Sequence, residues 1–375
     1  MRVIPNLNSA FRRSQRFTVL WAGLFGLIVL ITAAEGIVFW RMGFRYQPSS
    51  LPVAAWSNEI SIARKSNLAA LSVSIMGRLG NENWSDVVVI DPLRRDPVWL
   101  GVTHLNPHHV AIAPDANSVA IASEDGTIYS MTTPFNNSAT SEKRRERLFV
   151  HSGDGDFFQM VFAPDGQSIA ATGERFVSVW DWPTGLLLHQ HQYKQTGIEA
   201  RSIAFAPDSR TMASLDGNGC LRLYDARSGE LIQEKAVSEP PYSAAAVAFD
   251  AQLVAVAEGH LISVCGFEGD DTLWSSPCDS PIIAMSPSDG SLASVAFEHG
   301  GYRIMIRELE TGLARCRIDT GPPLIKGLEF ASDNLLYSTD SRGNVRAWDV
   351  DSQREQWVVP LLDSAPINEG IARSE

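Results

Sequence analysis

The sequence predicts an all-β protein, a seven-bladed β-propeller of four-stranded antiparallel blades, preceded by a single transmembrane helix. Three observations carry this prediction. The segments 162–181 and 205–225 repeat one pattern of strands and turns, which indicates a repeat unit. From about residue 58 onward, short apolar runs alternate with Gly, Asp, Asn and Pro and show no clean helical period. Near the N-terminus, 17–40 is almost uninterrupted apolar sequence.

The apolar segment 17–40 is long enough to cross the hydrocarbon core of a membrane. Three arginines precede it, at Arg12, Arg13 and Arg16. Because positive charge is retained on the cytoplasmic side, we expect 1–16 to be a cytoplasmic tail and the rest of the chain to lie outside the cytoplasm. The opposite topology, with a cytoplasmic propeller, is an alternative.

The same segment allows two interpretations. Trp21 and Trp40 stand near its two ends, as interface aromatics do, which favours an uncleaved signal anchor. Small residues at 32–34 also allow cleavage as a signal peptide. A polar linker is expected over 41–56, between the anchor and the propeller.

Seven units of roughly 40 residues are predicted over 57–362, the period of four-stranded propeller blades. The tail 363–375 is polar and predicted to be disordered. Ring closure stays open at this point. The seventh unit contains an outer strand of its own at 356–359, and the alternative is that 51–56 adds to that unit and joins it to the first.

Each unit carries turn signals with a physical reason. An apolar-Pro-Asp turn follows the innermost strand, because Pro fixes φ and the Asp side chain bonds nearby backbone amides. The third strand ends in an aromatic residue and Asp. The clearest turns are 113–115, 163–165 and 206–208, and the clearest strand ends are Trp180-Asp181, Tyr224-Asp225 and Trp348-Asp349.

At these turns and strand ends the chain resembles the WD40-repeat family, over nearly all of 58–360. The resemblance implies a closed propeller that binds proteins or peptides through its faces and central channel and has no catalytic activity. The Gly-His dipeptide of that family is missing here. Asp125, Asp216 and Asp340 occupy the place of the aspartate in the turn between second and third strands.

Composition excludes several functions. The net charge of -12 argues against a nucleic-acid surface, which needs clustered Lys and Arg. The four cysteines form no CxxC pair and have no His at zinc spacing. No nucleophile elbow or phosphate-binding glycine loop occurs. The sequence therefore predicts no catalytic, cofactor-binding or metal-binding residue.

Protein contacts are expected where the repeats differ. Turns that enter the innermost strands and turns between second and third strands emerge on one rim of a propeller. The candidate protein-binding residues on this rim are Asn106, His108, Asp156, Phe157, Arg175, Asn218 and Pro240. The predicted function is a membrane-anchored, non-enzymatic protein-interaction scaffold. The alternative is an exported propeller enzyme or small-ligand binder, quinoprotein-like or glycan-related.

Overall fold

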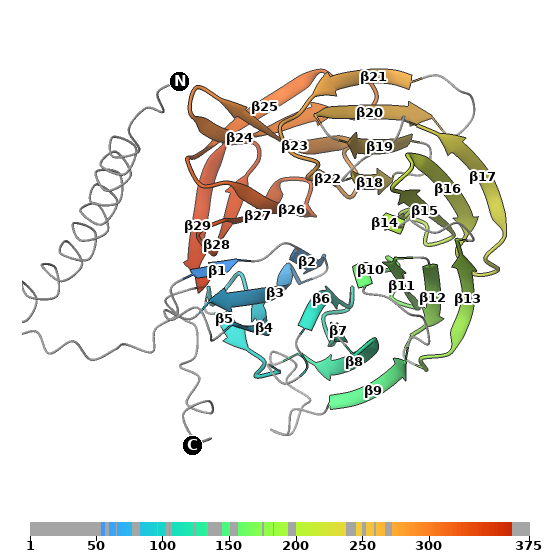
Figure 1. Cartoon of the computed structure of the whole chain (residues 1–375). Helices are drawn as coiled ribbons and strands as arrows, with labels where there is room; N and C mark the ends of the chain where they lie inside the picture. The colour runs from blue at the N-terminus through green and yellow to red at the C-terminus, as the bar shows by residue number, and fades with distance from the viewer. Residues whose placement is uncertain are drawn as a thin grey trace, which may run out of the picture. The chain divides into compact units, whose positions relative to one another are not determined.

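The fold is a closed ring of seven antiparallel sheets, as expected (Figure 1). It is seen in a computed structural model that describes the following residues: 54–56, 60–64, 66–76, 83–95, 97–102, 105, 107–123, 125–133, 145–150, 157–174, 176–182, 184–193, 200–237, 245–249, 253–258, 260–266 and 272–361. Within these ranges no helix has the length and apolar character to span a membrane. The predicted cytoplasmic tail 1–16, the anchor 17–40 and the tail 363–375 lie outside them.

Each sheet is one blade, built from consecutive strands that run from the centre of the ring outward. Blades 1 to 4 are formed by β1 (Ala54–Trp56), β2 (Ile60–Ala63), β3 (Leu68–Met76), β4 (Asn83–Ile90) and β5 (Pro97–Trp99); β6 (Pro107–Ile112), β7 (Ser118–Ser123), β8 (Thr127–Thr132) and β9 (Arg145–Val150); β10 (Phe157–Phe162), β11 (Ser168–Gly173), β12 (Phe176–Asp181) and β13 (Leu187–Gln192); and β14 (Ala200–Phe205), β15 (Thr211–Asp216), β16 (Cys220–Asp225) and β17 (Leu231–Ala236). Blades 5 to 7 are formed by β18 (Ala245–Phe249), β19 (Leu253–Glu258), β20 (Leu261–Gly266) and β21 (Thr272–Pro277); β22 (Ile283–Met285), β23 (Ser291–Glu298), β24 (Gly301–Glu308) and β25 (Ala314–Gly321); and β26 (Ile325–Ser332), β27 (Leu335–Asp340), β28 (Asn344–Asp349) and β29 (Arg354–Pro360).

The ring closes without exchange of a strand between the last and first blades. Blade 7 has its own outer strand, β29, which pairs with β28. Residues 54–56, predicted as part of a linker or as an addition to blade 7, instead form β1 and pair with β3 of blade 1. The expectation that 51–56 completes blade 7 is therefore wrong for these residues. β1 and β2 occupy the same edge of β3, because they pair with its two halves.

Side-chain packing closes the ring instead. The innermost strands contact one another in sequence around the ring, and β26 contacts β2. Ile60 and Leu71 of blade 1 share a buried cluster with Tyr337 and Trp357 of blade 7. The Tyr337 hydroxyl also donates a hydrogen bond to the Asn67 carbonyl at 3.2 Å. Among the described residues, one such apolar cluster fills each of the seven seams between blades.

The Pro-Asp turns make the backbone hydrogen bonds that the sequence predicts, and the aspartates that end third strands make similar ones. In each clear Pro-Asp turn a carboxylate oxygen accepts the amide of the residue two positions on, as Asp115 does from Asn117 at 2.9 Å and Asp208 from Arg210 at 2.8 Å. The aspartate that ends a third strand bonds the next turn in the same way, as Asp225 does from the Ser228 amide at 2.7 Å. These aspartates are therefore structural.

The fourth strands share an irregularity in blades 3 to 7. The pairing with the third strand shifts at the same position in each, leaving one unpaired residue, a β-bulge. In blades 3, 4 and 5 this unpaired residue is apolar and exposed. The three residues are Leu188 (41%), Ile232 (57%) and Leu273 (52%).

Candidate functional site

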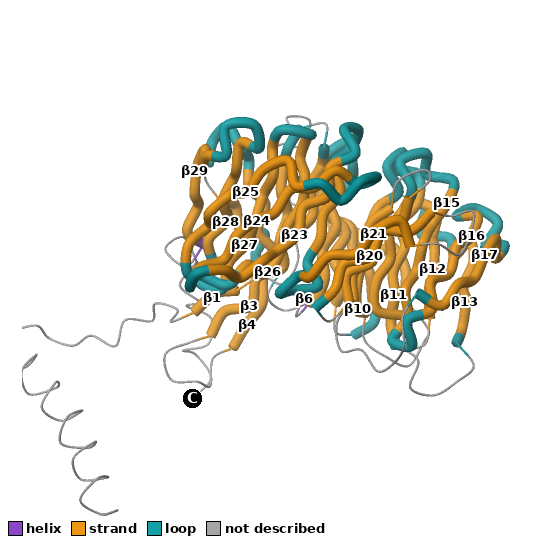
Figure 2. The backbone as a smooth tube through the Cα atoms, turned by 90° about the horizontal axis from the view of Figure 1, so that it is seen from above, coloured by secondary structure: helices purple, strands orange, loops and turns teal. Residues whose placement is uncertain are grey.

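The two faces of the ring carry different turns (Figure 2). We call the face with the turns between second and third strands, such as 217–219 and 299–300, the upper rim, which points down in the view of Figure 2. The described connections between blades 5 and 6 (278–282) and between blades 6 and 7 (322–324) also emerge there. The turns between first and second strands, and between third and fourth strands, form the lower face.

Three of the seven predicted binding residues lie in the described part of the chain. His108 and Asn218 are exposed on the upper rim, and their role in protein binding stays a prediction. Phe157 is only 4% exposed and belongs to the core between blades 2 and 3, where its ring meets Phe176 edge-on at 5.8 Å. Its neighbour Phe158 is half-buried instead. The other four, Asn106, Asp156, Arg175 and Pro240, lie outside the described residues.

Buried aspartates brace the upper rim of blades 4 and 7. Asp216 is 1% exposed, accepts the amides of Asn218 and Cys220, and pairs with the Arg222 guanidinium at 2.6 Å. Arg222 is held further by the Tyr193 ring, 4.9 Å from its central carbon.

Blade 7 repeats this arrangement with Asp340 (4% exposed) and Arg346 at 3.4 Å. A buried carboxylate needs a cationic or hydrogen-bonding partner. No Gly-His dipeptide precedes an innermost strand of this chain, and in blades 4 and 7 an arginine is the partner of the buried aspartate. These arginines were missed in the sequence, although both stand six residues after their aspartate.

Blade 6 departs most clearly from the regular pattern. Its second and third strands, β23 and β24, have eight residues each, whereas those of blades 2, 3, 4, 5 and 7 have six. Blade 1 is also long, but the tip of its hairpin, 77–82, is outside the described residues. The additional residues of blade 6 lie at the upper rim. They extend the hairpin by about 7 Å at roughly 3.3 Å per residue.

The blade 6 hairpin, residues 297–302, carries an exposed aromatic side chain. His299 and Gly300 form its two-residue turn with φ values of 52° and 80°, the left-handed conformation that such turns require. Phe297 stands directly opposite Tyr302, and their rings are 4.9 Å apart. Phe297 is 47% exposed. This site was not predicted from the sequence, although Phe-Glu-His-Gly-Gly-Tyr is a recognisable tight-hairpin signal.

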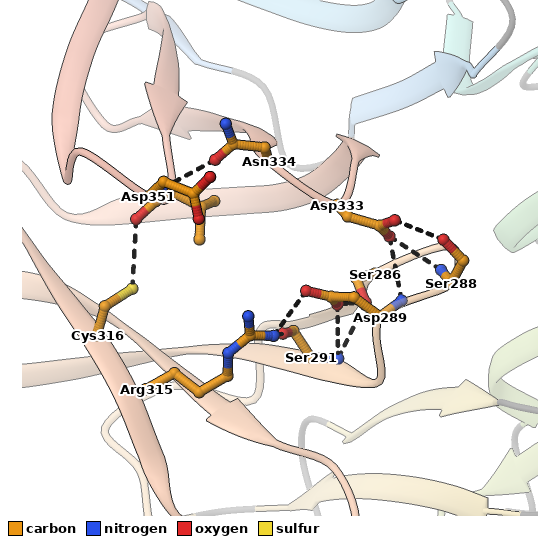
Figure 3. A network of polar contacts seen from close by, with 10 residues as sticks. Ser286, Ser288, Asp289, Ser291, Arg315, Cys316, Asp333, Asn334 and Asp351 are labelled. Atoms are coloured by element: carbon orange, nitrogen blue, oxygen red, sulfur yellow. Dashed lines mark hydrogen bonds and ion pairs between the residues drawn. The ribbon is translucent and has the colours of Figure 1, made fainter.

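The lower face is a network of turns that join neighbouring blades (Figure 3). Asp333 of blade 7 accepts the Ser288 amide of blade 6 at 2.9 Å and the Ser288 hydroxyl at 2.5 Å. Within blade 6, Asp289 pairs with Arg315 at 2.6 Å. These carboxylates are occupied by turn amides, hydroxyls and an arginine, so they hold the blades together.

His189 and His191 of blade 3 lie in the seam between blades 3 and 4. The His189 Nε2 lies 2.9 Å from the Ala226 carbonyl oxygen, and because a carbonyl only accepts, this nitrogen carries the proton. His191 stacks on Tyr224 at 4.3 Å. Burial lowers the pKa of His191. A hydrogen bond with the Gly229 backbone raises this pKa in part, and the neighbouring His189 lowers it further. No group of three His, Cys, Asp or Glu side chains suited to a metal occurs in the described ranges.

All four cysteines are free thiols in the described structure. Burial raises the pKa of each of them, most strongly at Cys220, where it reaches about 12. Cys220 also donates to Glu234 at 3.2 Å. Thiols held protonated in this way are poor nucleophiles at neutral pH, so they are structural.

Comparison with known proteins yields distant relatives. Mouse telomerase protein component 1 is 25% identical over 208 residues, which are 55% of this chain and 7% of that protein. U3 small nucleolar RNA-associated protein 7 of Saccharomyces cerevisiae is 22% identical over 203 residues, 54% of this chain and 33% of that protein. The chain thus covers a third or less of each relative. A comparison with protein families finds none that matches.

Proposed function

We propose that this protein is a WD40-like propeller that acts as a non-enzymatic protein-interaction scaffold and is held at a membrane by 17–40. The observation that carries the proposal is the blade 6 hairpin, which raises an exposed aromatic side chain beyond the six-residue second and third strands of blades 2, 3, 4, 5 and 7. Aromatic side chains, Phe included, are enriched at the cores of protein interfaces. The polar groups around the ring that recur from blade to blade are occupied by its own turns.

The relatives support this function by their printed names, since one is a telomerase protein component and the other is a small nucleolar RNA-associated protein. The first name describes a component of a larger assembly, and the second describes an association with a small nucleolar RNA. We propose the same general role here, with protein or peptide partners rather than nucleic acid, because the net charge of -12 opposes phosphate contacts.

The membrane part of the proposal comes from the sequence. The arginines before 17–40 favour a cytoplasmic N-terminus and an extracytoplasmic propeller. A reporter fused to the C-terminus tests the topology. An enzyme that is active only outside the cytoplasm should be active in the fusion, and activity of a cytoplasm-only reporter would overturn this part.

Affinity purification of the full chain from gently solubilised membranes tests the scaffold function. The expected result is at least one protein recovered in stoichiometric amount, and lost when Phe297 is replaced by Ala. Leu313→Ala is the matched control, because Leu313 is 65% exposed in the same blade but lies on the lower face. Recovery of a bound cofactor and no protein partner would contradict the proposal and favour the small-ligand alternative.

A further inference from the structure

We propose that the upper rim at the seam of blades 6 and 7 binds an acidic segment of a partner protein, which places one apolar side chain against Phe297. The inference rests on the proposed scaffold function and adds to it the surface and the chemistry of the partner. Three features of the described structure carry it: where the Phe297 ring lies, how firmly the hairpin is held, and which charges lie beside it.

The exposed ring of Phe297 continues the apolar core of this seam upward. Ala293 and Val295 are buried in the cluster that joins blades 6 and 7. Alternate residues of a strand share a face, so Phe297 follows them on the blade 7 side. Tyr302, opposite Phe297, packs against the same cluster. Because β23 outreaches the second strand of blade 7 at this end, the top of the seam carries apolar surface that blade 7 does not cover.

The hairpin is rigid at both edges. On the inner edge, the Phe297 amide donates to the Asp279 carboxylate at 2.6 Å, and the Asp279 amide donates to the Val295 carbonyl at 3.2 Å. On the outer edge, the Thr320 hydroxyl donates to the Tyr302 carbonyl at 2.8 Å. A side chain held in place before binding loses little conformational entropy on binding, which favours affinity.

The opposite face of the hairpin is neutralised by its own ion pairs. Arg303 contacts Glu298 at 3.3 Å and Asp319 at 2.6 Å. Arg317 lies 3.6 Å from the same Glu298. This side, which faces blade 5, therefore offers a partner neither apolar surface nor an unpaired charge, so the aromatic side is where binding is expected.

Two cations lie on the blade 7 side of the hairpin. Gly321 pairs with Tyr302, and four residues on, the β26 strand begins. The Leu324 carbonyl of that connection accepts the Ser341 amide at 2.8 Å, which brings the exposed Arg342 to the same part of the rim. Lys326, half-exposed, stands near the start of β26.

These two side chains differ from four other cations of blades 6 and 7, Arg303, Arg315, Arg317 and Arg346. No ion pair joins either Lys326 or Arg342 to any residue in the described ranges, whereas all four of these arginines are paired. On a chain with a net charge of -12, these cations have no ion pair in the described ranges and lie on the connection and the turn next to the blade 6 hairpin. They are complementary to acidic residues that flank an apolar residue of a partner.

Three of the other exposed apolar residues have a structural explanation. Leu188, Ile232 and Leu273 are exposed because the same bulge recurs in the fourth strands of blades 3, 4 and 5. Phe297 belongs to no such repeated position. The blade 6 hairpin is therefore the surface at which recognition is expected.

Selection from a random peptide library displayed on phage, against the detergent-solubilised full chain, tests the inference. We expect enriched peptides to combine an aromatic or large aliphatic residue with flanking Asp or Glu. Phe297→Ala should weaken binding of a synthetic enriched peptide about tenfold or more, as loss of an aromatic anchor does. The double variant K326E/R342E should weaken it severalfold at low salt and less at high salt.

Matched variants separate this inference from the proposed function. Leu313→Ala and Arg227→Glu alter an exposed apolar and an exposed cationic residue of the lower face, and both should leave peptide binding unchanged. If enriched peptides lose binding in these variants instead, or are basic, the inference is overturned while the scaffold function stands. If no peptide is enriched and membranes yield no protein partner, both are overturned.

Discussion

The seam between blades 3 and 4 and the seam between blades 5 and 6 are closed by the same contact made with different side chains. In blade 3, the His189 Nε2 bonds the Ala226 carbonyl of blade 4 at 2.9 Å. In blade 5, Trp274 occupies the same register position, and its Nε1 donates to the Leu309 carbonyl of blade 6 at 2.7 Å. Each ring lies over a glycine of the next blade, Gly229 or Gly312.

This comparison separates what the fold requires from what it tolerates. In blades 3 and 5 an aromatic ring with an N–H group at this position contacts a backbone carbonyl of the next blade. In blade 6 the Cys316 thiol occupies the same position and reaches the Val350 carbonyl at 3.6 Å. Trp274 adds apolar packing to the seam of blades 5 and 6, and its indole is uncharged at every pH. In the seam of blades 3 and 4 the side chains at and next to this position are histidines, which can be titrated. The two seams should therefore respond differently to truncation, to added volume and to acid.

Truncation of the aromatic contact should give the largest difference. Trp274→Ala removes a half-buried indole and its hydrogen bond, and we expect a loss of about 3 kcal/mol in the free energy of unfolding. His189→Ala removes a smaller ring with one hydrogen bond, so about 1 kcal/mol is expected. Urea unfolding of both variants measures the difference. Equal losses would show that the two seams depend on the shared bond and not on packing.

Added volume under the ring should have the next largest effect. A Cβ at Gly312 would lie 2.6 Å from the Trp274 ring, and the φ of +71° already disfavours a side chain. Gly312→Ala should therefore cost about 2 kcal/mol from strain and overpacking together. Gly290→Ala is the control, because its φ of +65° imposes similar strain while no atom lies within 4 Å of the added carbon.

The control should lose only about 1 kcal/mol, the cost of the left-handed backbone itself. Gly229→Ala should resemble Gly312→Ala, since its added carbon would meet the His189 ring at 2.6 Å as well. If Gly290→Ala and Gly312→Ala unfold at the same urea concentration, the close approach of the ring contributes nothing.

The repeated elements of the fold were predictable because each one depends on local chemistry. The Pro-Asp turns and the aspartates that end third strands bond amides two or three residues away, so their spacing is visible along the chain. Ring closure was not predictable in the same way. Both β1 and β29 suit an edge position, and which strand β1 pairs with depends on packing between residues far apart in the chain, such as Asn67 and Tyr337, which are 270 positions apart.

The candidate site was harder to predict for a different reason. Phe157 and Phe158 are adjacent residues of the same type, so the sequence does not show which one is buried. The register of β10 places Phe157 in the core. Phe297 is exposed because β23 extends beyond its neighbours, a property of relative strand length rather than of one segment. The seam contacts of His189 and Trp274 share a register position but no residue type, so no sequence repeat reveals them.

A lower pH should destabilise the seam of blades 3 and 4 but not that of blades 5 and 6, and we expect this effect to be smaller than those of truncation and added volume. Burial, and then His189, lower the pKa of His191 from its ordinary value of 6.5. The unfolded chain therefore binds more protons than the folded one in this window, so the stabilising contribution is full above about pH 6.5 and is lost as the pH falls through the folded pKa. Hydrogen exchange should show blade 3 and 4 amides opening more at about pH 5 than at about pH 7.5, with the blade 5 and 6 seam unchanged. In His191→Gln this difference should disappear, and its persistence would assign the acid response to another group.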